Sequence, residues 1–176
     1  MNEPTPAVVL RARHDSDLPA CAAALADVHA RDGYPVNWPA DPAGWLTTRT
    51  LIGAWVAELD GRVVGHVGLS GGTEDDIAPR LLSDRAAAPL VAATGVVSRL
   101  FVAPGARGHR IGALLMARVV AEARTRQLRP VLDVVATDTA AVALYERLGW
   151  ELLGTAEEQW GPEQKVTLRA YHLAAG

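Results

Sequence analysis

Residues 96–126 constrain the fold of this chain more than any other segment, because their pattern predicts a strand, a glycine-rich turn and a long helix. Val96–Val102 is rich in β-branched and aromatic residues, and Pro104-Gly105 ends that strand. After the turn, the helix Ile111–Arg126 carries apolar residues at positions i, i+3, i+4 and i+8. We expect these residues to form its buried face: Ile111, Leu114, Leu115 and Val119.

The turn between this strand and this helix predicts a phosphate site. A glycine-rich turn that opens a helix presents free backbone N–H groups and the positive end of the helix dipole to an anion. Arg107 and Arg110 add positive charge at the same place. A Walker A loop is excluded because the chain has no Gly-Lys pair, and the spacing of Gly105, Gly108 and Gly112 excludes a dinucleotide fingerprint.

The same segment resembles the acyl-CoA signature of the GNAT superfamily of N-acetyltransferases, [QR]-x-x-G-x-[GA]. Arg107 and Gly112 match it, whereas Arg110 stands where the first glycine is usual. We therefore expect the turn to avoid a positive φ at Arg110. The resemblance implies that the loop amides hold the CoA pyrophosphate. The implied CoA contacts are Leu100, Phe101, Val102, Arg107, Gly108, His109, Arg110, Ile111, Gly112 and Ala113.

A second segment, Asp138–Trp150, resembles the family signature N-x-x-A-x-x-L-Y-x-x-x-G-[FW]. Asp138, in place of the usual asparagine, is a good N-cap, and Gly149 is a good helix stop. The apolar positions Ala141, Leu144, Tyr145 and Leu148 share one helical face. The resemblance places Asp138 and Tyr145 in the CoA site. It also implies that Tyr145 is the general acid for the CoA thiolate; the alternative is an amphipathic core tyrosine.

Asp133 interrupts the otherwise apolar strand Val131–Ala136. A carboxylate in a buried strand is costly unless it is paired or functional. The ribosomal-protein alanine acetyltransferases of the family have an acidic residue twelve positions before the catalytic tyrosine, as Asp133 stands before Tyr145. Asp133 is therefore our candidate general base, acting through water. The alternative is an ion pair with an arginine, such as Arg99 or Arg129.

The resemblance implies an α/β (α+β mixed) fold in which helices flank a central twisted mixed sheet of about seven strands. Its fourth and fifth strands, Val96–Val102 and Val131–Ala136, should splay around the pantetheine arm, with the thioester near Leu100–Val102 and a backbone N–H there as oxyanion donor. The other predicted strands are Val8–Arg13, Ala54–Leu59, Val63–Leu69, Glu151–Glu157 and Lys165–Leu173. The other predicted helices are one capped by Ser16 or Asp17, a short one over Pro42–Thr48 and part of Ser70–Thr94.

Composition limits the class of protein. The 176 residues carry a net charge of −3, which does not suggest a nucleic-acid partner, and no apolar run is long enough to span a membrane. We expect one domain over residues 1–176, a cytoplasmic location, no metal and no disulfide, because Cys21 is the only cysteine. Cys21 and His66 are expected to be structural.

The predicted activity is transfer of an acetyl group from acetyl-CoA to a primary amine of a small molecule, by direct attack in a ternary complex. A protein or peptide N-acetyltransferase and a non-catalytic acyl-CoA-binding module are the alternatives, and a homodimer is left open. We expect one of two roles for the aromatic residues Tyr34, Trp38 and Trp45. They line the binding site of the acceptor amine, or they cover the edge of the sheet. The acidic run Glu74-Asp75-Asp76 attracts a cationic amine or is merely solvated.

Overall fold

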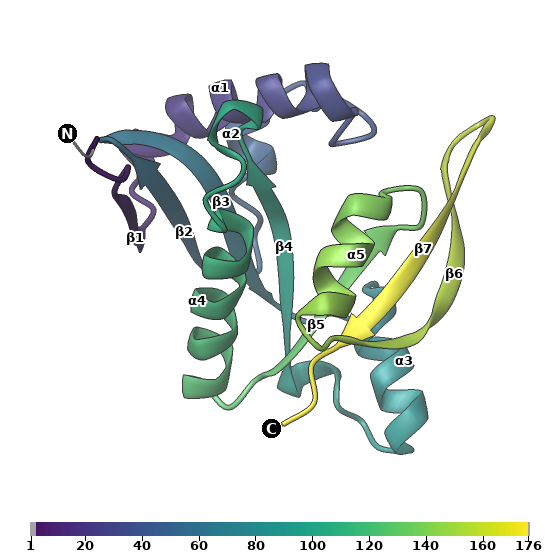
Figure 1. Cartoon of the computed structure of the whole chain (residues 1–176). Coiled ribbons are helices and arrows are strands. Elements are labelled where there is room, and N and C mark those ends of the chain that lie inside the picture. Colours follow the sequence, from purple (N-terminus) through teal and green to yellow (C-terminus); the bar gives the residue numbers. More distant parts are fainter. Residues whose placement is uncertain (1–2, 176) are drawn as a thin grey trace. The chain divides into compact units, whose positions relative to one another are not determined.

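The computed structural model describes residues 3–175 and contains a seven-stranded mixed sheet with the order β1-β2-β3-β4-β5-β7-β6 (Figure 1). The strands are β1 Val8–Ala12, β2 Leu51–Leu59, β3 Arg62–Gly71, β4 Thr94–Val102, β5 Arg129–Val135, β6 Glu151–Gly161 and β7 Gln164–His172. The α-helices are α1 Leu18–Asp32, α2 Pro42–Trp45, α3 Ile77–Ala86, α4 Ile111–Thr125 and α5 Thr139–Arg147. The predicted fold class is confirmed, and every predicted strand is present.

The contacts within the chain divide it into two compact units. The first unit contains residues 3–69 and 99–119, and the second contains residues 70–98 and 120–175. Strand β4 and helix α4 each contribute to both units.

The first unit packs helices on both faces of its strands. On one face, α1 and α2 cover a core formed by Cys21, Ala24, Leu25, Val28, Leu46, Val56 and Phe101. On the other face, α4 lies so close to β3 that a Cβ on Gly65 would stand 3.1 Å from side-chain atoms of both Ile111 and Leu115. Because side chains alternate along a strand, His66 points to the opposite face and stacks on Phe101, with ring centroids 5.2 Å apart.

The buried face of α4 differs from the prediction. Ile111, Leu115 and Val119 are buried, but Leu114 is 41% exposed. The buried stripe continues through Met116, Val120 and Ala123, so its centre is rotated around the helix away from Leu114.

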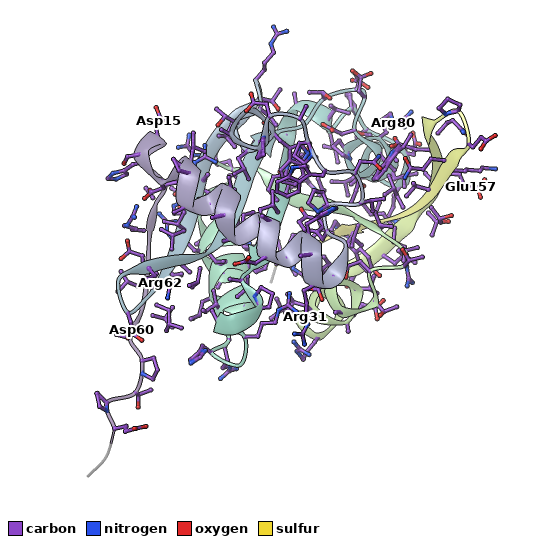
Figure 2. All side chains as sticks on the ribbon, turned by 90° about the horizontal axis from the view of Figure 1, so that it is seen from above. Asp15, Arg31, Asp60, Arg62, Arg80 and Glu157 are labelled. Carbon is purple, nitrogen blue, oxygen red and sulfur yellow. The ribbon has the colours of Figure 1, made fainter. Side chains whose placement is uncertain are left out.

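The hairpin of β2 and β3 follows its turn signal. Asp60 and Gly61 both have positive φ, 51° and 77°, as a two-residue turn of type I′ requires. Asp60 and Arg62 mark this turn in Figure 2. The predicted hairpin was correct, although both strands extend a few residues beyond the predicted bounds.

The second unit covers opposite faces of β5 and β7 with α3 and α5. Val131 and Ala170 belong to a core cluster that includes Ile77 and Ala78 of α3. Tyr171, the next residue of β7, points the other way and lies against Tyr145 of α5. Strands β4 and β5 are parallel over only three residue pairs, which end at Val96 and Val131 although both strands continue.

Candidate active site

The predicted phosphate loop lies in the first unit, between the end of β4 and the start of α4. A short 3₁₀ turn over Pro104–Ala106 is followed by Gly108 at φ 90° and by Arg110 at φ 60°. The expectation that Arg110 avoids a positive φ was wrong. Arg110 directly precedes the first helical residue of α4. Its backbone adopts the left-handed conformation, which has a steric cost for an arginine.

The charged side chains of this loop differ in their partners. Arg107 forms an ion pair with Asp32 near the end of α1, and this hydrogen bond lowers the pKa of Asp32. The Nδ1 atom of His109 lies 3.0 Å from the carbonyl oxygen of Ala106. Arg110 is exposed and forms no ion pair among residues 3–175. Arg110 is therefore the loop guanidinium that the described chain leaves available to a phosphate.

The remaining predicted CoA contacts lie on the elements that flank the loop. Leu100, Phe101 and Val102 end β4, and Ile111, Gly112 and Ala113 begin α4. Phe101 and Ile111 are buried.

Helix α5 carries the second signature as predicted. The Asp138 carboxylate caps the helix by accepting a hydrogen bond from the backbone N–H of Ala141 at 3.2 Å, and Gly149 follows the helix with φ 90°. Tyr145 is 8% exposed, and its ring centroid is 6.3 Å from that of Trp150 and 6.5 Å from that of Tyr171. The ring is thus fixed by aromatic packing in the second unit.

Asp133 in β5 has one carboxyl oxygen without a partner. Its Oδ1 atom is buried and has no hydrogen-bond partner among residues 3–175. Burial is the main cause that raises the pKa of Asp133 to about 7, and the carboxylates of Asp76 and Glu158 raise it further. The backbone N–H of Ala78 and the guanidinium of Arg80 act in the opposite direction.

Arg129, one of the arginines considered as a partner for Asp133, forms no ion pair with this carboxylate among the described residues of the second unit. A group that ionises near neutral pH is suited to accept a proton from a reacting amine.

The side chains of Asp133 and Tyr145 lie on opposite faces of the strands of the second unit. In the β5–β7 ladder Asp133 pairs with Ala170, on the face covered by α3, whereas the neighbouring Leu132 pairs with Tyr171, on the face covered by α5. Because Tyr145 belongs to α5, its side chain lies on the face opposite to that of Asp133. A base and an acid on opposite faces can serve different atoms of one reaction.

The three aromatic residues expected near the acceptor take part in two different ring contacts of the first unit. Tyr34 and Trp45 pack edge to face at 6.1 Å against the core of the first unit. Trp38 is 40% exposed and lies instead against the ring of His29, at 5.2 Å.

The sequence did not predict a group of hydrogen-bonded basic residues in the first unit, formed by Arg13, His66 and Arg99. The carbonyl oxygen of Arg99, which has φ 55°, lies 2.9 Å from Nδ1 of His66. Nε2 of His66 lies 3.0 Å from Nη1 of Arg13. A carbonyl oxygen only accepts hydrogen bonds, so Nδ1 of His66 is the donor and Nε2 accepts from Arg13. His66 is therefore neutral. Burial also lowers the pKa of His66 to about 4. His66 is structural, as expected. The apolar pattern of its strand did not predict its two partners, Arg13 and Arg99.

Two features are absent from residues 3–175. No group of three or more His, Cys, Asp or Glu side chains is placed to hold a metal ion. No helix in these residues is long and apolar enough to cross a membrane.

Comparison with known proteins supports the resemblance. A curated relative, "Probable N-acetyltransferase camello" of Xenopus tropicalis, is 37% identical over 98 residues, a segment that covers 55% of this chain and 37% of that protein. The chain thus matches well under half the length of this relative.

The fold matches solved structures along nearly its whole length. An N-acetyltransferase from Staphylococcus aureus Mu50 superposes with a TM-score of 0.71 at 20% identity, over 95% of this chain and 98% of that chain. YncA from Salmonella typhimurium, solved with its cofactor acetyl-CoA, superposes with a TM-score of 0.67 at 19% identity, over 95% of this chain and 93% of that chain. The model of the acetyltransferase (GNAT) family matches residues 22–150, and the chain belongs to this family.

Proposed function

We propose that this protein transfers an acetyl group from acetyl-CoA to a primary amine of a small molecule. The observation that carries the proposal is the glycine-containing loop that opens the 15-residue helix α4 with Arg110 unpaired, in a chain of the GNAT family. Backbone N–H groups at the start of such a helix and the free guanidinium suit a pyrophosphate. A solved structure of the same fold contains acetyl-CoA.

In the proposed reaction, Asp133 accepts a proton from the attacking amine through a water molecule. An alkylamine is almost entirely protonated at neutral pH, so a group that ionises near pH 7 helps to supply the neutral nucleophile. The amine nitrogen forms the new bond to the acetyl carbon. A backbone N–H within Leu100–Val102 stabilises the oxyanion, the C–S bond breaks, and the Tyr145 hydroxyl protonates the leaving thiolate. The ammonium group loses two protons overall. The first passes through Asp133 to solvent, and the second leaves the nitrogen as the amide forms and replaces, through solvent, the proton that Tyr145 gives to the thiolate.

Acetyl-CoA binding is tested first, by calorimetry. Reversing the charge of both loop arginines, Arg107→Glu with Arg110→Glu, should weaken acetyl-CoA binding at least about tenfold, because the free guanidinium of Arg110 is lost and two negative charges then repel the pyrophosphate. Arg62→Gln, at the β2–β3 turn, is the control and should leave the affinity unchanged. Equal affinity in the reversed variant and the wild type would refute the assignment of the loop.

Transfer is tested by following release of the CoA thiol with a panel of amines and peptides. Tyr145→Phe should reduce kcat about a hundredfold or more with an unchanged acetyl-CoA dissociation constant, since the substitution removes the proton donor and keeps the ring. The matched control is Tyr171→Phe in the same aromatic group, because the Tyr171 hydroxyl donates to Glu146 Oε1 at 2.9 Å. Wild-type kcat in Tyr145→Phe would rule out its role as the acid. A panel in which peptides alone are acetylated would favour the peptide alternative.

A further inference from the structure

We propose that the acceptor amine also carries a carboxylate, which the guanidinium of Arg99 binds, so that the substrates belong to the amino-acid class. This inference rests on the proposed acetyl transfer and specifies its acceptor.

Among the described residues, the guanidinium of Arg99 lacks the counter-ion that Arg11 and Arg107 of the first unit have. Arg11 forms ion pairs with two carboxylates, at 2.7 and 2.8 Å, and Arg107 pairs with Asp32. Arg99 is half-buried but pairs with no carboxylate among residues 3–175. Its Nε–H donates to the carbonyl oxygen of Trp45 at 3.3 Å, and the described chain offers no acceptor to its two terminal nitrogens.

The Arg99 side chain is held in place before any ligand arrives. Its guanidinium carbon lies 4.1 Å from the ring centroid of Trp45, and Tyr34 packs edge-on against that ring. Burial lowers the pKa of Arg99, which means that the charged form has lost part of its hydration. A fixed guanidinium with two parallel donors and reduced hydration matches the geometry of a carboxylate.

The backbone of Arg99 is constrained as firmly as its side chain. Arg99 has φ 55° within β4, a conformation that costs a non-glycine residue free energy. The neutral His66 donates to its carbonyl oxygen at 2.9 Å and accepts from Arg13 at 3.0 Å. Arg13 also pairs with no carboxylate among the described residues; its Nη1 donates to the Leu46 carbonyl at 2.8 Å. Two uncompensated positive charges therefore flank one buried histidine.

This positive site is distinct from the phosphate loop in the first unit. Arg99 contacts α2, and His66 stacks on Phe101, on the face covered by α1 and α2. The loop opens α4, which packs on the other face against Gly65. The anion bound at Arg99 is therefore assigned to the acceptor rather than to the CoA pyrophosphate.

The test compares matched acceptors in which only the carboxylate changes. Free α-, β- and γ-amino acids and their primary amides are supplied with acetyl-CoA, and kcat/KM is measured from thiol release. The amide of an α-amino acid has the more easily deprotonated amine, so intrinsic reactivity favours the amide. We expect the accepted amino acids to exceed their amides about tenfold or more in kcat/KM, the range of a charge-assisted contact.

Variants assign the preference to one side chain. Arg99→Gln should lower kcat/KM for the acid about ten- to a hundredfold and leave the amide and the acetyl-CoA affinity unchanged, and Arg99→Lys should recover part of the loss. Arg126→Gln, which removes an exposed pair with Glu122, is the control and should change neither substrate.

The outcomes separate this inference from the proposed function. If wild-type protein acetylates only amines without an acidic group, or acids and amides equally, the carboxylate site is refuted while acetyl transfer stands; this comparison needs no variant to fold. If the protein binds acetyl-CoA but no amine or peptide accelerates thiol release, the transfer itself is refuted.

Discussion

Replacing Asp133 by asparagine should stabilise the fold above neutral pH while it lowers acetyl transfer. Burial, helped by the carboxylates of Asp76 and Glu158, raises the pKa of Asp133 from 3.8 to about 7. The native state therefore holds this proton more tightly than the unfolded chain. The resulting stabilisation is complete below about pH 4 and is lost as the pH rises through about 7.

The structure sets the size of this effect. A separation between 3.8 and about 7 corresponds to at most about 4 kcal/mol, at about 1.4 kcal/mol for each pH unit. The Asp133 side chain is not completely buried, so solvent screens part of this penalty. We therefore expect Asp133→Asn to raise the free energy of unfolding at pH 8 by about 1–3 kcal/mol and to change it little at pH 4.

Urea unfolding at pH 4, 6 and 8 measures the stability, with Asp75→Asn, an exposed aspartate, as the control. The wild type and the control should lose stability across this range by more than Asp133→Asn does. In kinetics, kcat/KM of the wild type should rise with an apparent pKa of about 7, and Asp133→Asn should lack this rise and retain only a low rate. Equal stability of Asp133→Asn and wild type at pH 8 would refute the burial argument. Stabilisation with full transfer would refute the assignment of Asp133 as the base.

Three further predictions concern the backbone. Arg110→Gly should raise the free energy of unfolding by about 0.5–1 kcal/mol, because glycine adopts φ 60° without a clash; a lower melting temperature would contradict this. Gly72→Ala should cost about 2 kcal/mol or more in urea unfolding, since its Cβ would lie 2.7 Å from a carbonyl oxygen, whereas Gly71→Ala meets nothing within 4 Å and should be neutral. Asp138→Ala should cost about 1 kcal/mol because the N-cap bond to Ala141 is lost, and Asp138→Asn should retain most of that stability; equal thermal unfolding of the two variants would exclude the cap.

The parts of the fold that the sequence predicted depend on local physics. Asp138 and Gly149 bound α5 because a capping carboxylate and a left-handed glycine act within one turn of the helix. The Asp60-Gly61 turn sets its hairpin in the same way. Leu114 was misplaced because the apolar residues of α4 fit more than one helical face, and contacts with the sheet select the face that contains Met116.

The missed parts of the candidate site depend on partners far apart in the chain. Asp133 was recognisable as an exception in an apolar strand, but the absence of an arginine partner could be learned only from the fold. Arg99 was considered only as that partner. Its real neighbours, Trp45 and His66, come from segments whose patterns predict a short helix and a strand interior. The left-handed φ of Arg110 is likewise a property of how the loop enters α4.

The ionisable groups without a counter-ion lower the stability of the fold, and a bound substrate can offset this loss of free energy. A half-buried charge without a counter-ion lowers stability, and this chain supplies counter-ions elsewhere, as Arg11 shows with Asp17 and Glu58. Among the described residues, the exceptions include the carboxyl group of Asp133 in the second unit and the guanidinium groups of Arg99 and Arg13 in the first. If an amino-acid acceptor relieves the cost at Arg99, saturating acceptor should stabilise the wild type against urea by the mass-action amount for its dissociation constant, and Arg99→Gln should lose that increment while it keeps the increment from acetyl-CoA. An acceptor that stabilised both proteins equally would show that the free guanidinium is not its binding partner.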